Sequence, residues 1–324
     1  MDKVAEPFDV VTVFGGATLD RVGRTAAAPV MGASNPGTVV RIPGGVGFNV
    51  ASILARLGVH ARLVTRVGAD SDGEAVIAAA RDAGIDTTAL GVSPVAATAG
   101  YHAAFDNVGN LIIGVADMKI CDEITPVALG QIARGGHEHD FWVIDANLPK
   151  DTLAFLAVEA NEAGRPLAAL TVSPAKAMKL IPILDRLDYL FTNRREAAAL
   201  LGLDPMEPSA SVSWLAGELA RRRSTRVVVT NGAEPLAAAS AGDVRAYAPP
   251  RASVKAVNGA GDSFSAGAIR GLAGGHGLND AIRFGLAAAA MTLEAGSIHA
   301  APFSEDALAE RMGAGRSGPA LMAS

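Results

Sequence analysis

Residues 258–264 read NGAGDSF and lead directly into an apolar stretch that predicts a helix over residues 262–273. The small residues Gly259, Ala260 and Gly261 let backbone N–H groups crowd together where that helix begins. A loop of this kind, joined to a helix N-terminus, binds anions. The stretch therefore predicts a site for a phosphate or for the charge that develops on a phosphoryl group in transfer.

Asp262 stands at the rim of this predicted anion site. A carboxylate is a poor phosphate ligand, because like charges repel, but it suits a general base that takes the proton from an attacking hydroxyl. An aspartate with an ordinary pKa of about 3.9 is ionised at neutral pH, so the sequence requires no special shift. The alternative is an ordinary helix N-cap, where Asp and Ser are favoured.

The rest of the chain alternates strand and helix patterns, which favours a parallel sheet covered on both faces. Glycine is abundant, with 36 residues, as expected of many tight turns between strands and helices. Predicted strands cover residues 9–14, 39–42, 61–67, 141–144, 167–172, 189–191, 227–229 and 236–239. Predicted helices cover residues 49–57, 73–83, 150–163, 176–184, 195–201, 211–222, 262–273 and 278–293.

One segment breaks the alternation. Residues 97–105 and 110–115 are apolar or alternating and are joined by the turn-forming sequence DNVGN, which predicts a β-hairpin. With the strand near residue 39, this hairpin predicts a small β-layer built from residues near 12–42 and 95–118, inserted in one domain over residues 1–305. We expect this layer to act as a lid, and we expect the small, polar tail at 306–324 to fray.

Composition excludes several classes of function. The 324 residues carry a net charge of −5 and include no extended basic run, which argues against nucleic acid or anionic membrane as a partner. Cys121 is the only cysteine, so the chain has no internal disulfide and no cysteine-based zinc site. No signal-peptide pattern is present, and no stretch reaches the roughly 18 apolar residues of a membrane span. We therefore expect a cytoplasmic protein.

A second glycine cluster lies at residues 43–51, PGGVGFNVA. Gly44 and Gly45 permit close backbone approach to a ligand, and Asn49 supplies a donor and an acceptor at the start of a helix. The cluster does not match a dinucleotide fingerprint, because Val50 stands where Gly or Ala is required. A tight turn followed by an ordinary helix cap is the alternative interpretation.

Two weaker signals follow predicted strands. Asp20 comes soon after the first strand, where ligands of open α/β sheets bind, and its carboxylate can accept hydrogen bonds from two sugar hydroxyls. Asn193 and Glu196 follow the strand at 189–191 and can organise Mg²⁺ through water. Alone, Asp20 is equally typical of a surface loop, and Asn-x-x-Glu is equally typical of a helix cap.

Taken together and in this order, these motifs resemble the ribokinase-like (PfkB) carbohydrate kinase family over about residues 8–300. Residues 44–49, GGVGFN, resemble the first family signature. Residues 259–262, GAGD, resemble the second, which supplies the anion hole and the base. The resemblance implies an α/β fold: a ribokinase-like three-layer α/β/α sandwich with a mainly parallel central sheet and a small β-sheet lid.

The resemblance also implies roles for individual residues. Asp262 is the expected base and Gly259, Ala260 and Gly261 the anion hole, while Asn193 and Glu196 form the metal motif. The implied substrate contacts are Asp20, Gly44, Gly45, Asn49, Tyr101, Asn147 and Lys176. The implied nucleotide contacts are Asn193, Thr230, Gly232, Gly259 and Gly261.

Several stretches are most similar to the branch of the family that phosphorylates pseudouridine to its 5′-phosphate. They include residues 98–101, TAGY, and 172–180, VSPAKAMKL. The chain departs from that branch at Phe48, where Arg is expected, and at Leu170-Thr171, where Asp-Pro is expected. Asn147 stands where ribose-binding members carry Glu. These positions are on the expected substrate side, so the acceptor itself can differ.

The resemblance implies ATP and Mg²⁺ as cofactors, K⁺ as a further one, and a homodimer formed through the lid sheet. Three hypotheses are therefore kept: a pseudouridine kinase, a kinase of a free sugar or another nucleoside, and a non-catalytic sensor that binds such a ligand. An intact Asp262 and Asn193-x-x-Glu196 argue against the sensor.

Overall fold

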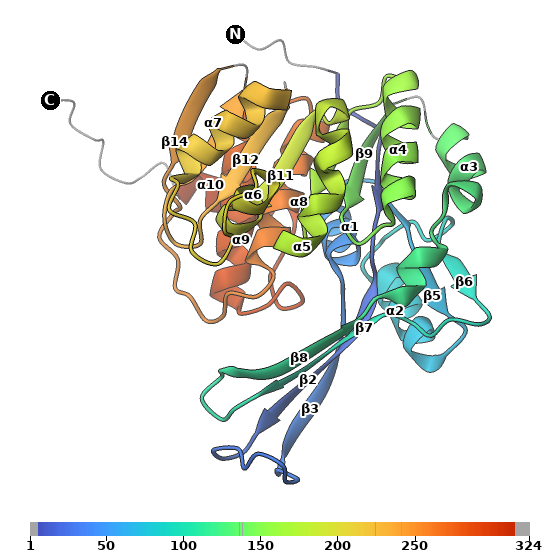
Figure 1. Cartoon of the computed structure of the whole chain (residues 1–324), viewed down its shortest axis with the longest axis vertical. Helices are drawn as coiled ribbons and strands as arrows, with labels where there is room; N and C mark the ends of the chain where they lie inside the picture. The colour runs from blue at the N-terminus through green and yellow to red at the C-terminus, as the bar shows by residue number, and fades with distance from the viewer. Residues whose placement is uncertain (1–5, 136, 138, 224, 241, 315–324) are drawn as a thin grey trace, which may run out of the picture.

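The computed structural model describes residues 6–135, 137, 139–223, 225–240 and 242–314. Its larger sheet has the strand order β14-β13-β12-β11-β10-β9-β1-β4 (Figure 1). The strands from β12 to β4 run parallel, and β13 and β14 continue the sheet antiparallel. These strands are β1 (Val10–Phe14), β4 (Ala61–Val64), β9 (Asp140–Asp145), β10 (Leu167–Leu170), β11 (Tyr189–Asn193), β12 (Arg226–Thr230), β13 (Leu236–Ser240) and β14 (Asp243–Tyr247).

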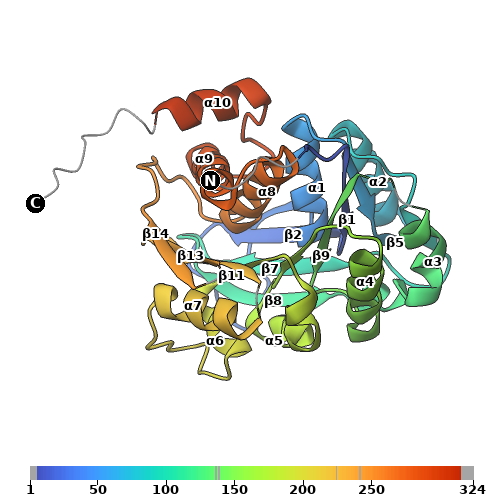
Figure 2. The same cartoon turned by 90° about the horizontal axis from the view of Figure 1, so that it is seen from above.

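Helices cover both faces of this sheet and give three layers (Figure 2). Successive strand residues, such as Phe141 and Trp142, point into two separate cores, because neighbouring side chains of a strand face opposite sides of the sheet. One face carries α1 (Val46–Arg56), α2 (Ser71–Asp82), α8 (Ala260–Ala273), α9 (Leu278–Ala295) and α10 (Glu305–Ala314). The other carries α3 (Pro126–Arg134), α4 (Lys150–Glu162), α5 (Pro174–Ala177), α6 (Arg194–Leu200) and α7 (Val212–Arg223).

A second sheet projects from one end of the body in Figure 1 and has the strand order β3-β2-β7-β8. We call it the lid sheet. The pairing of β7 with β8 is antiparallel, which confirms the predicted hairpin. Its strands are β2 (Thr18–Thr25), β3 (Gly37–Gly44), β7 (Gly100–Phe105) and β8 (Leu111–Asp117).

The structure corrects several expectations. Residues 12–14 belong to β1 of the large sheet, so the lid sheet begins at Thr18 rather than near residue 12. The predicted strand at 61–67 is broken into β4 and β5 (Arg66–Gly68), and β5 leaves the large sheet to pair with β6 (Gly91–Ser93). The predicted helix at 176–184 is α5 followed by a 3-10 helix, η2 (Met178–Arg186). A further 3-10 helix, η1 (Lys119–Glu123), precedes α3.

The expectation of a fraying tail is wrong over residues 306–314, which belong to α10 (Glu305–Ala314). Leu308 is buried in the core, and Arg311 forms a 2.8 Å ion pair with Glu294 of α9. Burial of one apolar position per turn is enough to fix a short helix on a larger body. Residues 315–324 lie outside the described residues.

Candidate active site

The carboxyl ends of several parallel strands and the first turns of α1 and α8 meet at one edge of the large sheet, where ligands of open α/β sheets bind. A cavity of about 160 Å³ lies there. Its lining comes from the ends of β10, β11 and β12 and from the starts of both helices. Among the predicted site residues, it is lined by Asn193, Glu196, Thr230, Gly261 and Asp262.

The first turn of α8 is built from the predicted anion loop. Gly259 precedes the helix with a left-handed φ of +79°, and a Cβ there would lie 2.5 Å from Cδ1 of Ile298. Both facts require glycine at this position. Gly261 has open space where a Cβ would be, and no side chain caps this helix terminus. The N-terminal turn of α8 is therefore accessible to a ligand.

Asp262 is partly buried, and its Oδ2 accepts a 2.7 Å hydrogen bond from Nδ2 of Asn49. Burial raises the pKa of Asp262 to about 6; the Asn49 bond opposes this shift, and the nearby carboxylates of Asp145 and Glu196 add to it. The expectation of an ordinary pKa was therefore wrong. A carboxylate with a pKa of about 6 is still mostly ionised at neutral pH and is a stronger base than an ordinary one.

Asp145, at the end of β9, joins the two glycine loops beside the cavity, and the sequence analysis missed it. It is fully buried, and its Oδ2 accepts hydrogen bonds from the backbone N–H groups of Gly16 (2.9 Å) and Gly47 (3.0 Å). Gly45 has φ of +91°, and a Cβ there would lie 2.6 Å from the carbonyl oxygen of Gly16. One acid ending an otherwise apolar strand, FWVID, was the available signal.

Asp20, Gly44 and Tyr101 come together at the base of the lid sheet. Oδ1 of Asp20 accepts a 3.1 Å hydrogen bond from the backbone N–H of Tyr101. A Cβ on Gly44 would lie 2.7 Å from Oδ2 of Asp20, so glycine keeps that oxygen uncrowded. Burial raises the pKa of Asp20, while contacts with Thr18 and Tyr101 oppose the shift. Asp20 thus lies in β2 with a backbone hydrogen-bond partner rather than in a surface loop.

Asn147 and Lys176 form a pair beside the glycine loop at Gly16. Nζ of Lys176 donates a 2.5 Å hydrogen bond to Oδ1 of Asn147. Nζ of Lys179 donates to the carbonyl oxygens of Asn147 (3.2 Å) and Leu148 (3.0 Å). A Cβ on Gly16 would lie 3.1 Å from Nδ2 of Asn147, so this pair adjoins the glycine loop that Asp145 holds.

Asn193 and Glu196 form a complete capping box at the start of α6. Oδ1 of Asn193 accepts from the backbone N–H of Glu196 (3.0 Å), and Oε2 of Glu196 accepts from the backbone N–H of Asn193 (3.2 Å). The hydroxyl of Thr171 donates to the same Oε2. The helix-cap interpretation is therefore confirmed, in a pair that also lines the cavity with Asp262.

Val172, next to Thr171, has φ of +67°, the only positive φ of a non-glycine residue in the described part of the chain. The N–H of Ser173 donates to the carbonyl oxygen of Thr171 at 2.7 Å, which closes a strained γ-turn centred on Val172. Because of this turn, β10 ends at Leu170, whereas the predicted strand extends to residue 172. A β-branched residue in this region is unusual and is often found at functional sites.

A second cavity, of about 290 Å³, adjoins the first, and both are lined by Thr230, Gly261 and Phe264. Gly232, one of the residues expected to contact the nucleotide, lies on its wall. Its apolar lining was not predictable from the sequence, because those residues come from separate elements and form no motif. They include Leu236, Val254, Val257, Leu286, Ala289 and Leu293.

A model of the pfkB family of carbohydrate kinases matches residues 9–303. The chain belongs to the pfkB family of carbohydrate kinases. A pseudouridine kinase of Escherichia coli is 29% identical over 289 residues, covering 88% of this chain and 90% of the relative. A ribokinase of Bacillus subtilis is 28% identical over 292 residues, covering 87% and 92%.

Solved structures of carbohydrate kinases have the same fold as this pfkB family member. A carbohydrate kinase from Agrobacterium tumefaciens is 37% identical, with a TM-score of 0.82, over 94% of this chain and 97% of that one. A ribokinase of Arabidopsis thaliana, complexed with ribose and ATP, has the same fold with a TM-score of 0.79 at 20% identity, over 95% and 99%. The ribokinase-like fold expected from the sequence is therefore confirmed. In the described part of this family member, no helix is long and apolar enough to span a membrane.

Proposed function

We propose that this protein transfers the γ-phosphoryl group of ATP to a sugar hydroxyl of a nucleoside, with Asp262 as the general base. The position of Asp262 carries the proposal. Its carboxylate accepts a hydrogen bond from Asn49, on the side where Asp20 and the glycine loops lie. Asp262 also lines the smaller cavity, which adjoins the larger apolar cavity. A base between an acceptor and a donor is what phosphoryl transfer requires.

The larger cavity is proposed to bind the nucleotide base. It is mainly apolar, and its volume of about 290 Å³ suits a flat ring system with a few polar groups at its rim. Thr230 and Gly261 lie where it meets the cavity of Asp262, so a nucleotide bound there would direct its phosphates at the first turn of α8. Gly259 and Ala260 complete the proposed anion hole.

Most of the rate enhancement is expected from positioning and charge stabilisation. Asp20 and the backbone at Gly44 and Gly45 would hold the sugar, and Asn49 would orient the carboxylate of Asp262. Asp262 would then take the proton of the acceptor hydroxyl as the hydroxyl oxygen attacks the γ-phosphorus, and the bond from that phosphorus to the bridging β-phosphate oxygen would break and release ADP. Closure of the lid sheet would exclude water and so suppress hydrolysis of ATP.

The described residues fit a magnesium ion held mainly by the nucleotide. They include no group of three His, Cys, Asp or Glu side chains arranged to hold a metal. Mg²⁺ usually binds one or two carboxylates together with substrate phosphates and keeps several waters. Glu196 and Asn193, which line the cavity, would contact such waters, and the ion would neutralise phosphate charge. K⁺ near the anion hole is kept as part of this proposal.

The proposed acceptor is pseudouridine, with formation of pseudouridine 5′-phosphate. The pseudouridine kinase relative supports this acceptor, and so do Tyr101 and Lys176, which the structure places at the base of the lid sheet and beside Asn147. The departures at Phe48 and Leu170 leave a free sugar or another nucleoside as the alternative acceptor. Retention of the fold for ligand sensing alone is the third candidate.

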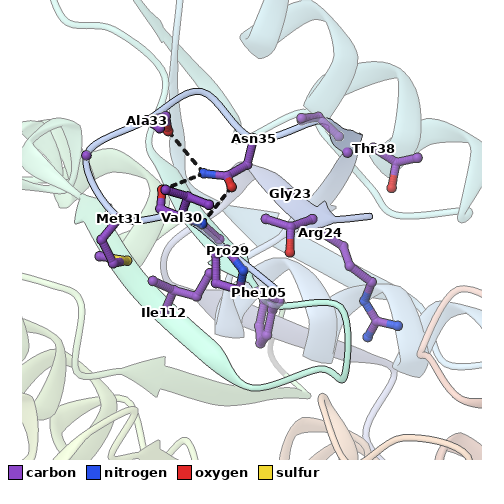
Figure 3. Close-up of a pocket in the computed structure, with 15 residues that line it drawn as sticks. Gly23, Arg24, Pro29, Val30, Met31, Ala33, Asn35, Thr38, Phe105 and Ile112 are labelled. Carbon is purple, nitrogen blue, oxygen red and sulfur yellow. Dashed lines mark hydrogen bonds between the residues drawn. The ribbon is translucent and has the colours of Figure 1, made fainter. Parts of the chain in front are cut away.

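A homodimer through the lid sheet is also proposed. Gly23, Val39, Ala104 and Ile113 lie in one row across the sheet, and the side chains of Val39 and Ile113 are 71% and 60% exposed. Figure 3 shows the hollow at the tip of this sheet, where Asn35 hydrogen bonds to Val30 and Ala33. A second copy of the chain would cover this exposed apolar surface. Sedimentation equilibrium of the wild type and of Ile113→Glu tests this, because the substitution should shift a dimer toward monomer.

The experiment that tests the activity is ATP consumption with Mg²⁺ and K⁺ against pseudouridine, uridine, adenosine, inosine, ribose and fructose, with mass analysis of the product. Turnover confined to pseudouridine is the expected result. Turnover with another member of the panel would contradict the acceptor and leave the kinase mechanism standing. Binding of a panel member without any ATP consumption would replace the kinase proposal with the sensor.

A further inference from the structure

The segment that follows α9, residues 296–303, crosses from the anion loop to the base of the lid sheet; we call it the strap. It begins at Gly296, which ends α9 with φ of +88°. Ile298 is buried and packs on Gly259, the residue that precedes α8. One end of the strap therefore contacts the loop that starts the catalytic helix.

Arg56, at the end of α1, fixes the strap in place. Its Nη1 donates a 2.9 Å hydrogen bond to the carbonyl oxygen of Ile298, and its Nη2 donates to that of Ala301. Its guanidinium also lies 5.1 Å from the ring centroid of Phe303. A planar cation with two carbonyl acceptors and an aromatic face leaves the strap little freedom to move relative to α1.

His299 connects the strap to the lid sheet. Its Nε2 lies 3.0 Å from the carbonyl oxygen of Pro43, in β3. A carbonyl oxygen can only accept, so Nε2 carries the proton and donates. Pro43 is paired with Leu19 of β2, and the next pair in the register is Gly44 with Thr18. The hydrogen bond thus fixes β3 at Pro43, the residue before Gly44, and Gly44 packs against Asp20.

Burial lowers the pKa of His299; the bond to Pro43 and the carboxylate of Asp20 oppose this shift, whereas Arg56 adds to it. His299 also acts on Asp20, where it opposes the rise in pKa that burial causes. Pro43, which His299 contacts, is paired with Leu19, so His299 lies close to Asp20 although the two come from opposite ends of the chain.

We propose that His299 is a positioning residue that holds the base of the lid sheet against the strap and thereby sets the affinity for the acceptor. The proposal rests on the proposed kinase function. Asp20 and Gly44 are the groups that the hydrogen bond to Pro43 keeps in register, and both are on the acceptor side of Asp262. The bond acts on the acceptor side, so we expect its loss to change nucleotide binding and proton transfer less than acceptor binding.

The test compares the variants His299→Ala and His299→Gln with His60→Ala as a matched control. In Gln, Nε2 of the amide can occupy the place of the imidazole Nε2 and donate to Pro43. His60 is mostly exposed and lies at the start of β4, at the opposite edge of the sheet from the site. Loss of one hydrogen bond predicts an acceptor KM about five- to tenfold higher in His299→Ala. The KM for ATP and kcat should change less than about twofold, and Gln should restore most of the acceptor KM.

Hydrogen–deuterium exchange of backbone amides gives a readout that does not depend on activity. In His299→Ala, exchange over residues 37–44 should become faster, while exchange over β1 and β9 stays unchanged. If the wild type proves inactive and this local change still occurs, the kinase proposal fails and the positioning role of His299 on the lid stands. If the wild type is active and His299→Ala changes neither the acceptor KM nor the exchange of residues 37–44, the inference about His299 is wrong.

Discussion

The side-chain amide of Asn49 donates a 2.7 Å hydrogen bond to the carboxylate of Asp262, a residue 213 positions later in the chain. Asn49 lies in the first turn of α1, and Asp262 lies in the first turn of α8. Two helix starts therefore point at one place, beside the cavity at the carboxyl edge of the sheet.

The pH dependence of the reaction should report the raised pKa of Asp262. Burial raises this pKa to about 6, and only the ionised carboxylate can accept a proton. With decreasing pH, kcat/KM should therefore fall about tenfold per unit below pH 6 and level off above pH 7. Initial rates from pH 5 to 9 measure this. An acid limb near pH 4 would contradict the raised pKa.

Replacement of Asn49 by Ala should move that acid limb to higher pH. The Asn49 hydrogen bond lowers the pKa of Asp262, so its removal lets burial raise the pKa further. A shift of the acid limb would distinguish titration of Asp262 from titration of the nucleotide phosphates, because the substitution does not change the pKa of the free nucleotide. Ser52→Ala, one turn along the same helix, is the control, and its limb should stay where the wild type has it.

Gly259→Ala should cost both stability and activity. The substitution forces a side chain into φ of +79° and against Ile298. Gly164→Ala is the matched control, because Gly164 has φ of +64° with no atom near the added Cβ. The control should lose about 1–2 kcal/mol of stability and keep its activity. Thermal unfolding should show a larger loss for Gly259→Ala, and equal losses would rule out the contact with Ile298 as the cause.

Val172→Gly should separate strain from packing. Glycine adopts φ of +67° without cost, whereas Ala removes side-chain volume and keeps the strained backbone. Val172→Gly should unfold at a temperature equal to or above that of Val172→Ala. It should also have a lower kcat than the wild type, because the turn that directs Thr171 toward Glu196 is loosened. A wild-type kcat in Val172→Gly would mean that the strained turn has no part in positioning.

Much of the fold was predictable, because the buried strands are apolar runs that end in glycine. The lid strand β2 was not identified as a strand, since Asp20, Arg21 and Arg24 interrupt its apolar residues. α10 was expected to be a tail because it is a short helix with a weak apolar pattern, in which Leu308 is the buried residue. These elements are held by contacts with distant segments, which local periodicity does not reveal.

In the candidate site, too, local motifs were predictable from the sequence and contacts between distant segments were not. Residues in compact motifs, such as Asp262 and Asn49, were identified from the sequence and lie together. Asp145 and His299 were missed, because each acts through a backbone group that is distant in the chain, at Gly16 and Pro43 respectively. The strain at Val172 is a backbone property that no residue type announces.

The most direct test of the account is the single-turnover rate of phosphoryl transfer by the wild type and by Asp262→Asn, with saturating ATP, Mg²⁺ and the acceptor found in the panel. Loss of the base should lower the rate on the order of 10² to 10⁴, while the circular dichroism spectrum and nucleotide binding stay intact. A rate within a few fold of the wild type would show that Asp262 is not the base and would contradict the account.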